Sequence, residues 1–317
     1  MLTKINNYIE ALPLDIAPKG LYAPIRYVLS LGGKRIRPVL MMMAYELWKD
    51  DSESILQQAV ALETYHNFTL LHDDVMDKAD MRRGMPTVHK RWNENTAILS
   101  GDNMLCLAYK WMMDNGNVPA EVMKTFCDTT IEINHGQQLD VDFETRNDVT
   151  EEEYIEMIRL KTSVLLACAL KIGALMAGAP KEDVDNLYRF GEAIGLAFQL
   201  QDDYLDVYGN PAIFGKAIGG DIASNKKTYM LINALQKAQG DDYEQLKYWI
   251  QAKKFVKKEK IASVTRIYDK LGIDKMATAK MEEYYEKAIA ALDKVNVPAE
   301  KKTALKEYAM KMMKRNS

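Results

Sequence analysis

Strong helix formers dominate this chain, and residues that break helices are scarce. Leu, Ala, Met, Glu and Lys are abundant, whereas glycine and proline number only 17 and 9 in 317 residues. Several segments repeat apolar residues with the 3.6-residue period of a helix, and no Val/Ile/Thr run alternates between turn residues. The sequence therefore predicts an all-α fold of ten or more helices without a convincing strand. Because no linker is visible, a single large helical bundle over residues 1–317 is the simplest architecture.

Three helix starts can be predicted from capping residues. Thr150 and Glu153 form a capping box, which predicts a helix that begins there and continues past Lys161. Ser52 is a candidate cap for the helix that precedes the first acidic motif described below. Pro298 is expected in the first turn of the last helix, where a missing N–H costs little.

Composition excludes several classes of protein. The net charge of −3, from 42 basic and 45 acidic residues, is unlike the strongly basic surfaces that bind nucleic acids. Three scattered cysteines in no CxxC pair indicate a reducing compartment, without a disulfide framework or zinc knuckle. The N-terminus lacks the apolar core of a signal peptide, and the most apolar stretch, 164–179, is interrupted by Lys171 and short for a membrane span. We expect a cytoplasmic enzyme with no nucleic-acid partner and no membrane span.

The acidic motif DDxxD occurs twice, each time near the expected C-terminal end of an apolar helix. Its carboxylates are Asp73, Asp74 and Asp77 in the first copy and Asp202, Asp203 and Asp206 in the second. The first and last aspartate of each copy share a helix face, and such crowded charges need a counterion. Mg²⁺ prefers oxygen ligands and bridges carboxylates to phosphates, whereas an EF-hand would require a glycine and a terminal glutamate that are missing. A solvated helix end would explain one copy, but two copies favour a metal site that clamps one polyphosphate.

Basic residues follow or precede these motifs where phosphate can be held. The segment Gly32–Pro38 opens an apolar helix, and helix N-termini attract anions. Lys34 and Arg37 are three apart and are expected on one side of that first turn. Arg82 and Arg83 lie in a loop after the first aspartate motif, and arginine suits bidentate phosphate contact.

A second basic loop follows the second aspartate motif. It is broken by glycines and carries Lys216 and Lys226, so the chain twice places a basic loop after an acidic helix end. Polar residues also interrupt otherwise apolar helix faces, and a buried lysine or amide needs a partner. Taken alone, a histidine at such a position would be an ordinary core residue. The residues in question are His66, Gln199, Lys161 and Thr162.

Taken together and in this order, the motifs resemble those of the trans-isoprenyl diphosphate synthases, also called polyprenyl synthetases. The motifs are GGKRIRP, DDVMD followed by RRGMPTVH, LKT, FQLQDDYLD and GKxxGGD, from Gly32 to about Thr228. The resemblance implies an isoprenoid-synthase bundle with a central cavity and a homodimer. It also implies an enzyme that uses three Mg²⁺ ions to join isopentenyl diphosphate head-to-tail with allylic diphosphates.

The resemblance also implies roles for individual residues. Both sets of aspartates would hold Mg²⁺ against the allylic diphosphate. That diphosphate would contact Arg82, Lys161, Lys216 and Lys226. The diphosphate of isopentenyl diphosphate would contact Lys34, Arg37, His66 and Arg83. The allylic cation would form beside Thr162, Gln199 and the side chain of Lys161, while Asp140 has a less defined role. A slightly longer loop than in some relatives leaves the choice between Lys226 and Lys227 open.

Phe68 is the residue expected to limit product length. It lies five residues before Asp73, about 7.5 Å along the helix, and the family associates a bulky aromatic there with short products. Because Thr69 is small, we expect a product of C15 to C20, with C20 geranylgeranyl diphosphate favoured. The residue that limits product length would form the floor of the cavity that holds the growing chain. If Phe68 is only a core residue, this floor lies elsewhere, around Met104 to Ala108.

Two alternative functions stay open from the sequence. A terpene cyclase usually carries a single DDxxD with a different second metal motif, and it lacks a pocket for a second diphosphate. A non-catalytic subunit of the same fold typically loses one aspartate cluster. Both motifs are intact here, which favours the prenyltransferase.

Overall fold

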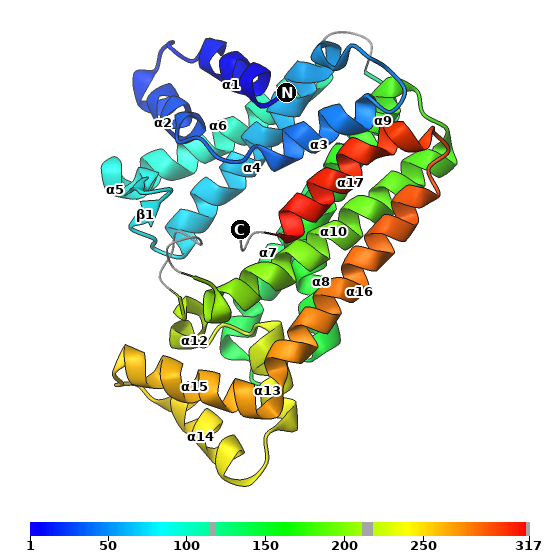
Figure 1. Ribbon diagram of the computed structural model, residues 1–317. Helices are drawn as coiled ribbons and strands as arrows, with labels where there is room; N and C mark the ends of the chain where they lie inside the picture. The colour runs from blue at the N-terminus through cyan, green and yellow to red at the C-terminus, as the bar shows by residue number, and fades with distance from the viewer. Residues whose placement is uncertain (115–117, 211–217, 315–317) are drawn as a thin grey trace. The chain divides into compact units, whose positions relative to one another are not determined.

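The computed structural model describes residues 1–114, 118–210 and 218–314, and its secondary structure is almost entirely helical (Figure 1). This confirms the all-α prediction. Within the described residues the strands are confined to one antiparallel pair, in which β1 (Met81–Arg82) pairs with β2 (Met85–Pro86). The hairpin lies where the sequence predicts a loop, because two-residue strands leave no alternating pattern.

The chain forms two compact units, and each is described by itself. The first comprises Met1–Phe126 with Ala169–Val184, and the second comprises Cys127–Cys168 with Asp185–Ser317. Three helices contribute residues to both units: α7 (Ala120–Thr145), α9 (Val164–Ala177) and α10 (Lys181–Tyr208). The single domain expected over residues 1–317 stays a prediction.

The first unit is built around α4, which packs against α1, α2, α3 and α6 (Figure 1). Every side chain of α4 from Gln58 to Tyr65 is buried, including the polar residues Glu63 and Thr64. A helix enclosed in this way has no solvated stripe, so its polar residues must find partners within the protein. The elements of this unit are α1 (Leu2–Ala11), α2 (Lys19–Ser30), α3 (Ile36–Tyr45), η1 (Ser52–Ile55), α4 (Leu56–Met76), α5 (Val88–Arg91) and α6 (Glu94–Met113).

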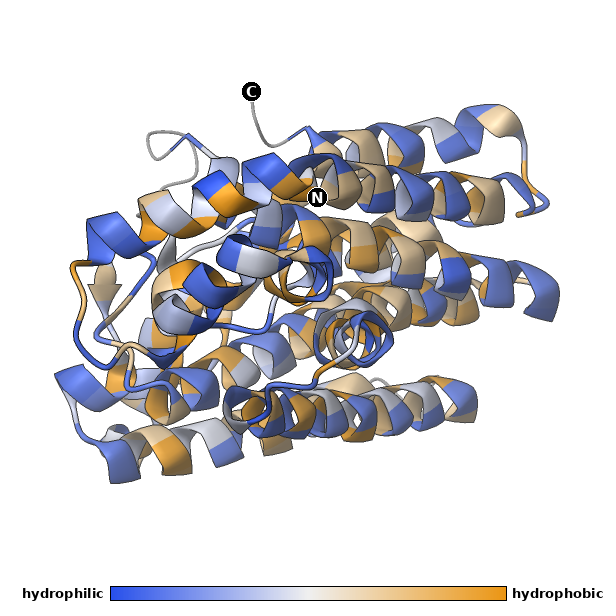
Figure 2. Ribbon diagram, turned by 90° about the horizontal axis from the view of Figure 1, so that it is seen from below, coloured by the Kyte–Doolittle hydropathy of each residue, from blue (hydrophilic) through white to orange (hydrophobic). Residues whose placement is uncertain are grey.

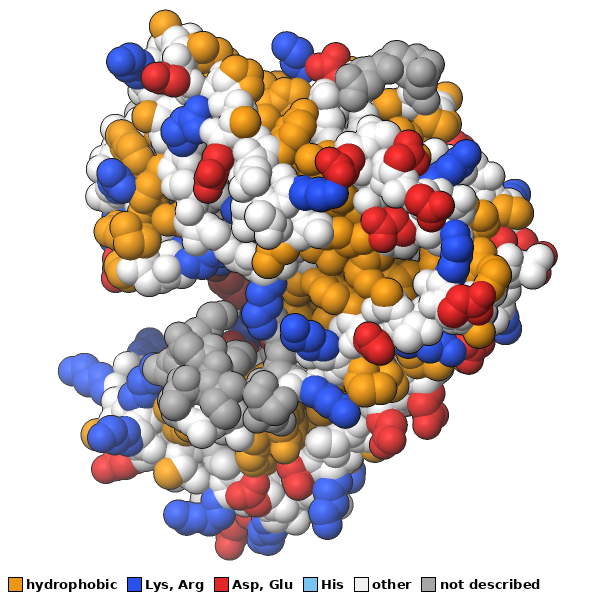
Figure 3. Space-filling model, turned by 45° about the horizontal axis from the view of Figure 1, so that its top comes forward, with side chains coloured by type: hydrophobic (Ala, Val, Ile, Leu, Met, Phe, Trp, Pro, Cys, Tyr) orange, Lys and Arg blue, Asp and Glu red, His pale blue; other side chains and the backbone are white. Residues whose placement is uncertain are grey.

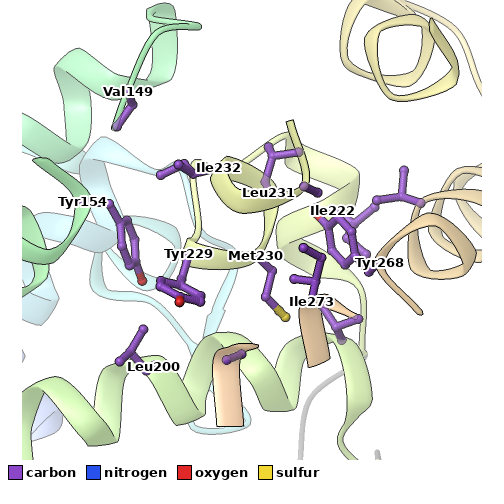
Figure 4. Packing of buried hydrophobic residues seen from close by; sticks show 14 of the residues in the cluster. Val149, Tyr154, Leu200, Ile222, Tyr229, Met230, Leu231, Ile232, Tyr268 and Ile273 are labelled. Atoms are coloured by element: carbon purple, nitrogen blue, oxygen red, sulfur yellow. The ribbon is translucent and has the colours of Figure 1, made fainter. Parts of the chain in front are cut away.

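The second unit has a core in which short helices pack on longer ones. Its elements are α8 (Glu151–Ile158), η2 (Arg159–Ser163), α12 (Gly220–Ser224), α13 (Tyr229–Lys237), α14 (Gly240–Gln251), α15 (Lys257–Leu271), α16 (Ile273–Asp293) and α17 (Ala299–Met313). Figure 4 shows part of this core, where Ile222 and Tyr268 lie next to each other and Met230 lies near Ile273. The helix α15 packs against α12, α13 and α14 and so anchors the segment that follows α10.

The predicted helix ends are partly confirmed. The capping box of Thr150 and Glu153 is present, with reciprocal side-chain to backbone hydrogen bonds. Ser52 does not cap a helix; it starts the 3₁₀ helix η1, and its hydroxyl donates to Glu46 instead. Pro298 is the N-cap of α17 and lies just before the first turn in which it was expected.

The helical segment predicted to begin at Thr150 and to continue past Lys161 is present and is largely apolar. Glu151–Ala177 runs as a continuous helical segment, and by length and composition it could cross a membrane. However, 72% of its most apolar window is buried inside the protein, as in the core helix of a globular fold. Figure 2 shows that other helices mix hydrophilic and hydrophobic residues, and in Figure 3 acidic and basic side chains are interspersed over the visible face.

Candidate active site

The first aspartate motif lies at the C-terminal end of α4, as predicted. The helix closes with a Schellman motif, in which Ala79 N–H donates to Asp74 O at 3.0 Å and Lys78 adopts the left-handed conformation with φ 53°. Asp73 is partly buried, whereas Asp77 caps the helix and is exposed. The chain reversal after Lys78 brings the following arginines back toward this helix end.

Asp74 and Arg82 form a bidentate ion pair. Nε of Arg82 lies 2.8 Å from both carboxylate oxygens of Asp74, and Nη2 lies 2.8 Å from Oδ1. The carboxylate is nearly buried, with 6% of its side chain exposed, whereas 31% of the Arg82 side chain is exposed. A predicted metal ligand and a predicted phosphate ligand therefore contact each other directly.

Arg83 is placed by the tight turn of the β1–β2 hairpin. Arg83 and Gly84 have φ of 51° and 76°, the combination that a type I′ turn requires. The turn directs the Arg83 side chain back into the first unit, where Nη1 donates to the carbonyl oxygen of Gly32 and, at 3.4 Å, to Oδ1 of Asn67. The hairpin thereby connects the second arginine of the pair to the glycine segment before α3.

A cluster of arginines lies near His66 on α4. Burial, followed by the charges of Arg37, Arg83, Arg82 and Arg35, lowers the pKa of His66 well below its usual value, so the imidazole is neutral. Burial also lowers the pKa of Arg37 to about 10, with the nearby Arg83 adding to the effect. Among the described residues, the buried Nε of Arg37 has no hydrogen-bond partner. The charge of Glu63 opposes this lowering, so a donor without a partner lies here among several arginines and one glutamate, which makes the cluster a candidate site for an anion.

The buried carboxylate of Glu63 connects residues of this arginine cluster through hydrogen bonds. Arg35 Nη1 donates to Glu63 Oε1 at 2.9 Å, and both side chains are 2% exposed. Asn67 Nδ2 also donates to Glu63 Oε1 at 3.1 Å, and Asn67 in turn accepts from Arg83. Neither Glu63 nor Arg35 was among the predicted site residues. A glutamate within a run of buried residues was the available signal, because a buried charge needs a partner.

The start of α3 differs from the expected geometry. The helix begins at Ile36, and its N-cap, Arg35, adopts the left-handed conformation with φ 48°. Arg37 is in the first turn as predicted, but Lys34 precedes the helix and is exposed. The prediction that Lys34 and Arg37 share one side of that turn is therefore wrong.

Phe68 lies on α4, between His66 and Asp73 in sequence. Its ring is partly buried and packs at 5.5 Å from the ring of Tyr65 and at 4.8 Å, edge to face, from His72. The imidazole of His72 is held in turn by Ile98 O at 3.2 Å. These contacts fix the ring orientation of Phe68, as a floor beneath a growing chain would require.

In the second unit, Asp203 is the buried member of its motif. It is 3% exposed, accepts a hydrogen bond from the hydroxyl of Tyr154, and accepts a second from Nε2 of Gln199 at 3.3 Å. Thr162 Oγ1 donates to Gln199 Oε1 at 3.3 Å and extends this chain. Burial, with the nearby charge of Asp221, raises the pKa of Asp203 to about 7. Three predicted residues are thus brought together, and Tyr154 and Asp221 join them.

Asp206 is tied to the short helix α12. Its Oδ2 accepts from the backbone N–H of Asp221 at 2.9 Å. Beyond α12, Lys226 is exposed, and its charge partly opposes the rise in the pKa of Asp203. Lys227 is buried. The geometry favours Lys226 in the choice that the sequence left open. Lys216 lies outside the described residues.

Lys161 and Thr162 lie in a π-helical turn. η2 (Arg159–Ser163) interrupts the helical segment between α8 and α9, and such turns occur frequently at functional sites. Lys161 Nζ lies 2.5 Å from Oδ2 of Asp140 on α7, and both side chains are partly exposed. A Cβ on Gly136 would lie 2.3 Å from the Lys161 backbone nitrogen, so the close approach of α7 requires glycine there. Asp140 thereby gains a defined partner.

The carboxylates fit a magnesium ion that is shared with a ligand. The described residues contain no group of three or more His, Cys, Asp or Glu that could hold a metal alone. Mg²⁺ usually binds one or two carboxylates and completes its shell with waters and substrate phosphates. Burial and then the charge of Asp221 raise the pKa of Asp203, and a bound cation would act in the opposite direction. The donor chemistry is therefore right for Mg²⁺ held jointly with diphosphate.

Comparisons with known proteins show which family this chain is similar to. Residues 18–268 match the family model for polyprenyl synthetase. A geranylgeranyl diphosphate synthase of Methanosarcina mazei is 46% identical over 231 residues, which are 72% of this chain and 71% of that protein. A crystal structure of a geranylgeranyl pyrophosphate synthase has a TM-score of 0.94 at 41% identity and covers 99% of this chain and 98% of its own. A further geranylgeranyl pyrophosphate synthase, from Corynebacterium glutamicum and complexed with isoprenyl diphosphate and magnesium, has a TM-score of 0.86 at 31% identity, with 99% and 97% covered.

Proposed function

Because the chain belongs to the polyprenyl synthetase family, as a short-chain trans-prenyltransferase, we propose that it condenses isopentenyl diphosphate head-to-tail with allylic diphosphates. The observation that carries this proposal is the arginine cluster near His66, in which the Nε of Arg37 has no hydrogen-bond partner among the described residues. An arginine cluster that can bind an anion, separate in sequence from the second aspartate motif, supports a site for a second diphosphate. A terpene cyclase needs only one.

The charged residues divide between the two substrates. We assign isopentenyl diphosphate to Arg37, Arg83 and the neutral His66, which can donate one hydrogen bond to phosphate, and by family resemblance to Lys34. We assign the allylic diphosphate to Arg82 and Lys226, and to Lys161 and Lys216 by family resemblance. Asp73, Asp77, Asp202, Asp203 and Asp206 would hold Mg²⁺, which when bound neutralises charge on the leaving diphosphate. Three ions are proposed on the resemblance alone.

The reaction then proceeds in steps that these side chains can support. The allylic C–O bond breaks, and Arg82 and Lys226 stabilise the negative charge that the departing diphosphate gains. By family resemblance, we assign Thr162 and Gln199 to the place where the allylic cation forms. The double bond of isopentenyl diphosphate attacks that cation and forms the new C–C bond. The attack leaves a positive charge on the former isopentenyl group. A proton then leaves the carbon next to that charge and passes to an oxygen of the released diphosphate.

We propose C20 geranylgeranyl diphosphate as the main product. The partly buried ring of Phe68, held by Tyr65 and His72, supports a floor on α4. Relatives named for geranylgeranyl diphosphate support the same length. The alternative product is C15 farnesyl diphosphate. In that case farnesyl diphosphate should accumulate and should not be extended when it is supplied as a primer.

We also propose that the protein is a homodimer in the cytoplasm. Exposed apolar side chains on α6 support self-association, with Leu99 60%, Met113 54% and Ile98 43% exposed. Cys106, Cys127 and Cys168 form no disulfide, and so low and scattered a cysteine count supports a reducing compartment. Light scattering after size-exclusion chromatography tests the dimer, and Leu99→Glu should shift it toward the monomer. Fractionation of the source cells tests the location.

One assay separates the proposed function from its alternatives. The protein is incubated with labelled isopentenyl diphosphate and with dimethylallyl, geranyl or farnesyl diphosphate, with Mg²⁺ or with excess chelator. A prenyltransferase incorporates label into a longer prenyl diphosphate, and only in Mg²⁺. A terpene cyclase consumes the allylic substrate without isopentenyl diphosphate, and a non-catalytic subunit consumes neither. Either of the last two results would refute the proposal.

A further inference from the structure

Lys260 on α15 is a buried lysine outside the residues so far assigned. Only 1% of its surface is exposed. Its Nζ donates to Asn225 Oδ1 at 2.6 Å and to Ala223 O at 3.2 Å, and it lies 4.4 Å from the centre of the Phe255 ring. Burial lowers its pKa. Burying an ammonium is costly, and here two oxygen acceptors and an aromatic face compensate for the lost water.

The two acceptors belong to the end of α12. Ala223 lies in the last turn of that five-residue helix, and Asn225 follows it as the C-cap with φ 58°. Asn225 also donates from Nδ2 to Ile250 O at 3.0 Å. Ile222 of α12 packs in the core next to Tyr268 of α15 (Figure 4). Lys260 therefore fixes the polar end of a segment whose apolar face is already anchored.

That segment connects the second aspartate motif to a proposed phosphate ligand. At its start, Asp221 N–H donates to Asp206 Oδ2 at 2.9 Å. At its end, Lys226 follows Asn225 directly, and Lys226 N–H donates back to Asp221 O at 2.9 Å. The position of the exposed Lys226 side chain thus depends on the conformation of Asn225, which Lys260 holds.

We propose that Lys260 is a positioning residue for the allylic diphosphate. By holding Asn225 in its left-handed conformation, it fixes Lys226 in the place from which the ammonium reaches phosphate. Lys260 itself is enclosed by protein and acts only through its neighbour. This inference rests on the proposed function, because it assumes that Lys226 contacts the allylic substrate.

The chain contains a matched control for a buried lysine of this kind. Lys302 on α17 is 8% exposed, and its Nζ donates to Asp293 O and Val295 O, both at 3.0 Å. It therefore also binds carbonyl oxygens at the end of a helix, α16. No residue proposed for substrate or metal binding follows that helix end among the described residues. Lys302→Met removes the same chemistry at a position without this role.

The test compares Lys260→Met with Lys302→Met in the full-length protein. Methionine retains the length of the apolar stem and removes the ammonium. For Lys260→Met we expect the KM for the allylic diphosphate to rise about 10-fold or more, as for the loss of one charge-assisted contact. The KM for isopentenyl diphosphate should change less than about 2-fold, because its proposed ligands lie in the first unit. Lys302→Met should leave both KM values unchanged.

A second variant tests whether Lys260 acts through Asn225. Asn225→Gly permits the left-handed backbone and removes the acceptor. If the two residues form one unit, the double variant has the KM of Asn225→Gly alone. Multiplicative effects of the two substitutions would overturn the proposal, as would an unchanged allylic KM in Lys260→Met. Equal increases in the KM of both substrates would do the same, because they indicate general damage.

Hydrogen exchange provides a readout that does not need activity. Amides of residues 221–228 should exchange faster in Lys260→Met than in the wild-type protein or in Lys302→Met. Unchanged exchange there would refute the positioning role. If the wild-type protein showed no condensation with any primer, the proposed function would fail, and the exchange comparison would still decide whether Lys260 holds this segment.

Discussion

The Nε atom of Arg82 lies 2.8 Å from each carboxylate oxygen of Asp74. The pairing separates Asp74 from the other two aspartates of its motif, because its carboxylate already has a bidentate cationic partner. Asp73, one position before it, is assigned to Mg²⁺. Replacing Asp73 and replacing Asp74 should therefore impair different kinetic constants.

We predict that Asp73→Ala lowers kcat by about 10²–10³-fold or more, because it removes stabilisation made in the transition state. Asp74→Asn should instead raise the KM for the allylic diphosphate, because it releases the guanidinium of Arg82. Steady-state kinetics with each substrate varied in turn measure both effects. Asp80→Asn is the control, since Asp80 is an exposed carboxylate that pairs with Lys90. Identical defects in the Asp73 and Asp74 variants would contradict this division.

Arg37→Ala should raise the KM for isopentenyl diphosphate selectively. Losing a charge-assisted contact costs about 1.5–3 kcal/mol, or roughly 10- to 150-fold. The KM for the allylic diphosphate should stay within about 2-fold, because its ligands remain. Arg26→Ala serves as the control, because Arg26 donates only to backbone carbonyls of Glu10 and Leu12. A change confined to the allylic substrate would show that the two sites are exchanged.

The lowered pKa of His66 predicts a specific acid sensitivity. Below pH 6.5 the unfolded chain protonates this histidine while the folded protein does not, so the free energy of unfolding falls as pH falls. The loss is at most about 1.4 kcal/mol per pH unit. His66→Gln should flatten the dependence of Tm on pH below 6.5. Parallel Tm curves for His66→Gln and the wild-type protein would exclude a shifted pKa at this site.

Phe68→Ala should lengthen the product by at least one five-carbon unit, because it removes the ring from the proposed floor. Phe68→Leu retains most of the volume and should leave the product unchanged. Chromatography of the dephosphorylated products gives the length. Full truncation of a buried phenylalanine costs about 3–5 kcal/mol, so folding of the variant is verified first by its Tm. The same product from both variants would place the floor elsewhere, for example near Met104 to Ala108.

Gly136→Ala should destabilise the protein and reduce turnover together. The added methyl group would lie 2.3 Å from the backbone nitrogen of Lys161, and overpacking of this kind costs about 1–3 kcal/mol. Displacement of Lys161 would also break its contact with Asp140. Gly20→Ala is the control, because nothing lies within 4 Å of a Cβ at Gly20 in α2. Thermal unfolding and kcat measure the two effects, and a neutral Gly136→Ala would contradict the close approach.

Much of the fold could be predicted because it depends on local patterns. Helix propensity and the 3.6-residue period gave the all-α class, and the capping box at Thr150 gave a helix start that the structure confirms. The β1–β2 hairpin was missed because its two-residue strands carry no period. It depends on the left-handed turn at Arg83 and Gly84 instead. Ser52 was misassigned because its hydroxyl had an alternative acceptor, Glu46, that only the tertiary structure shows.

The candidate site was predictable to the extent that it uses recognisable motifs. The aspartates, arginines and lysines stand in short characteristic patterns, and the structure places Thr162, Gln199 and Asp203 in one hydrogen-bonded chain. The supporting residues Glu63, Tyr154 and Asp221 were not identified. Each is far in sequence from at least one partner that it serves, and such pairings follow from packing rather than from local spacing. Whether both aspartate motifs bind one diphosphate stays a prediction.

The π-helical turn η2 also determines how this chain can vary in length. A π turn holds one residue more than an α turn, and one residue rotates a helix by about 100°. Deleting any single residue from 159–163 would let the segment continue as a regular α-helix, and the deletion would look harmless in an alignment. It would nevertheless turn the buried face of α9 away from its present neighbours relative to α8. Homologues of this chain should therefore accept gaps on either side of this helical segment but conserve its length.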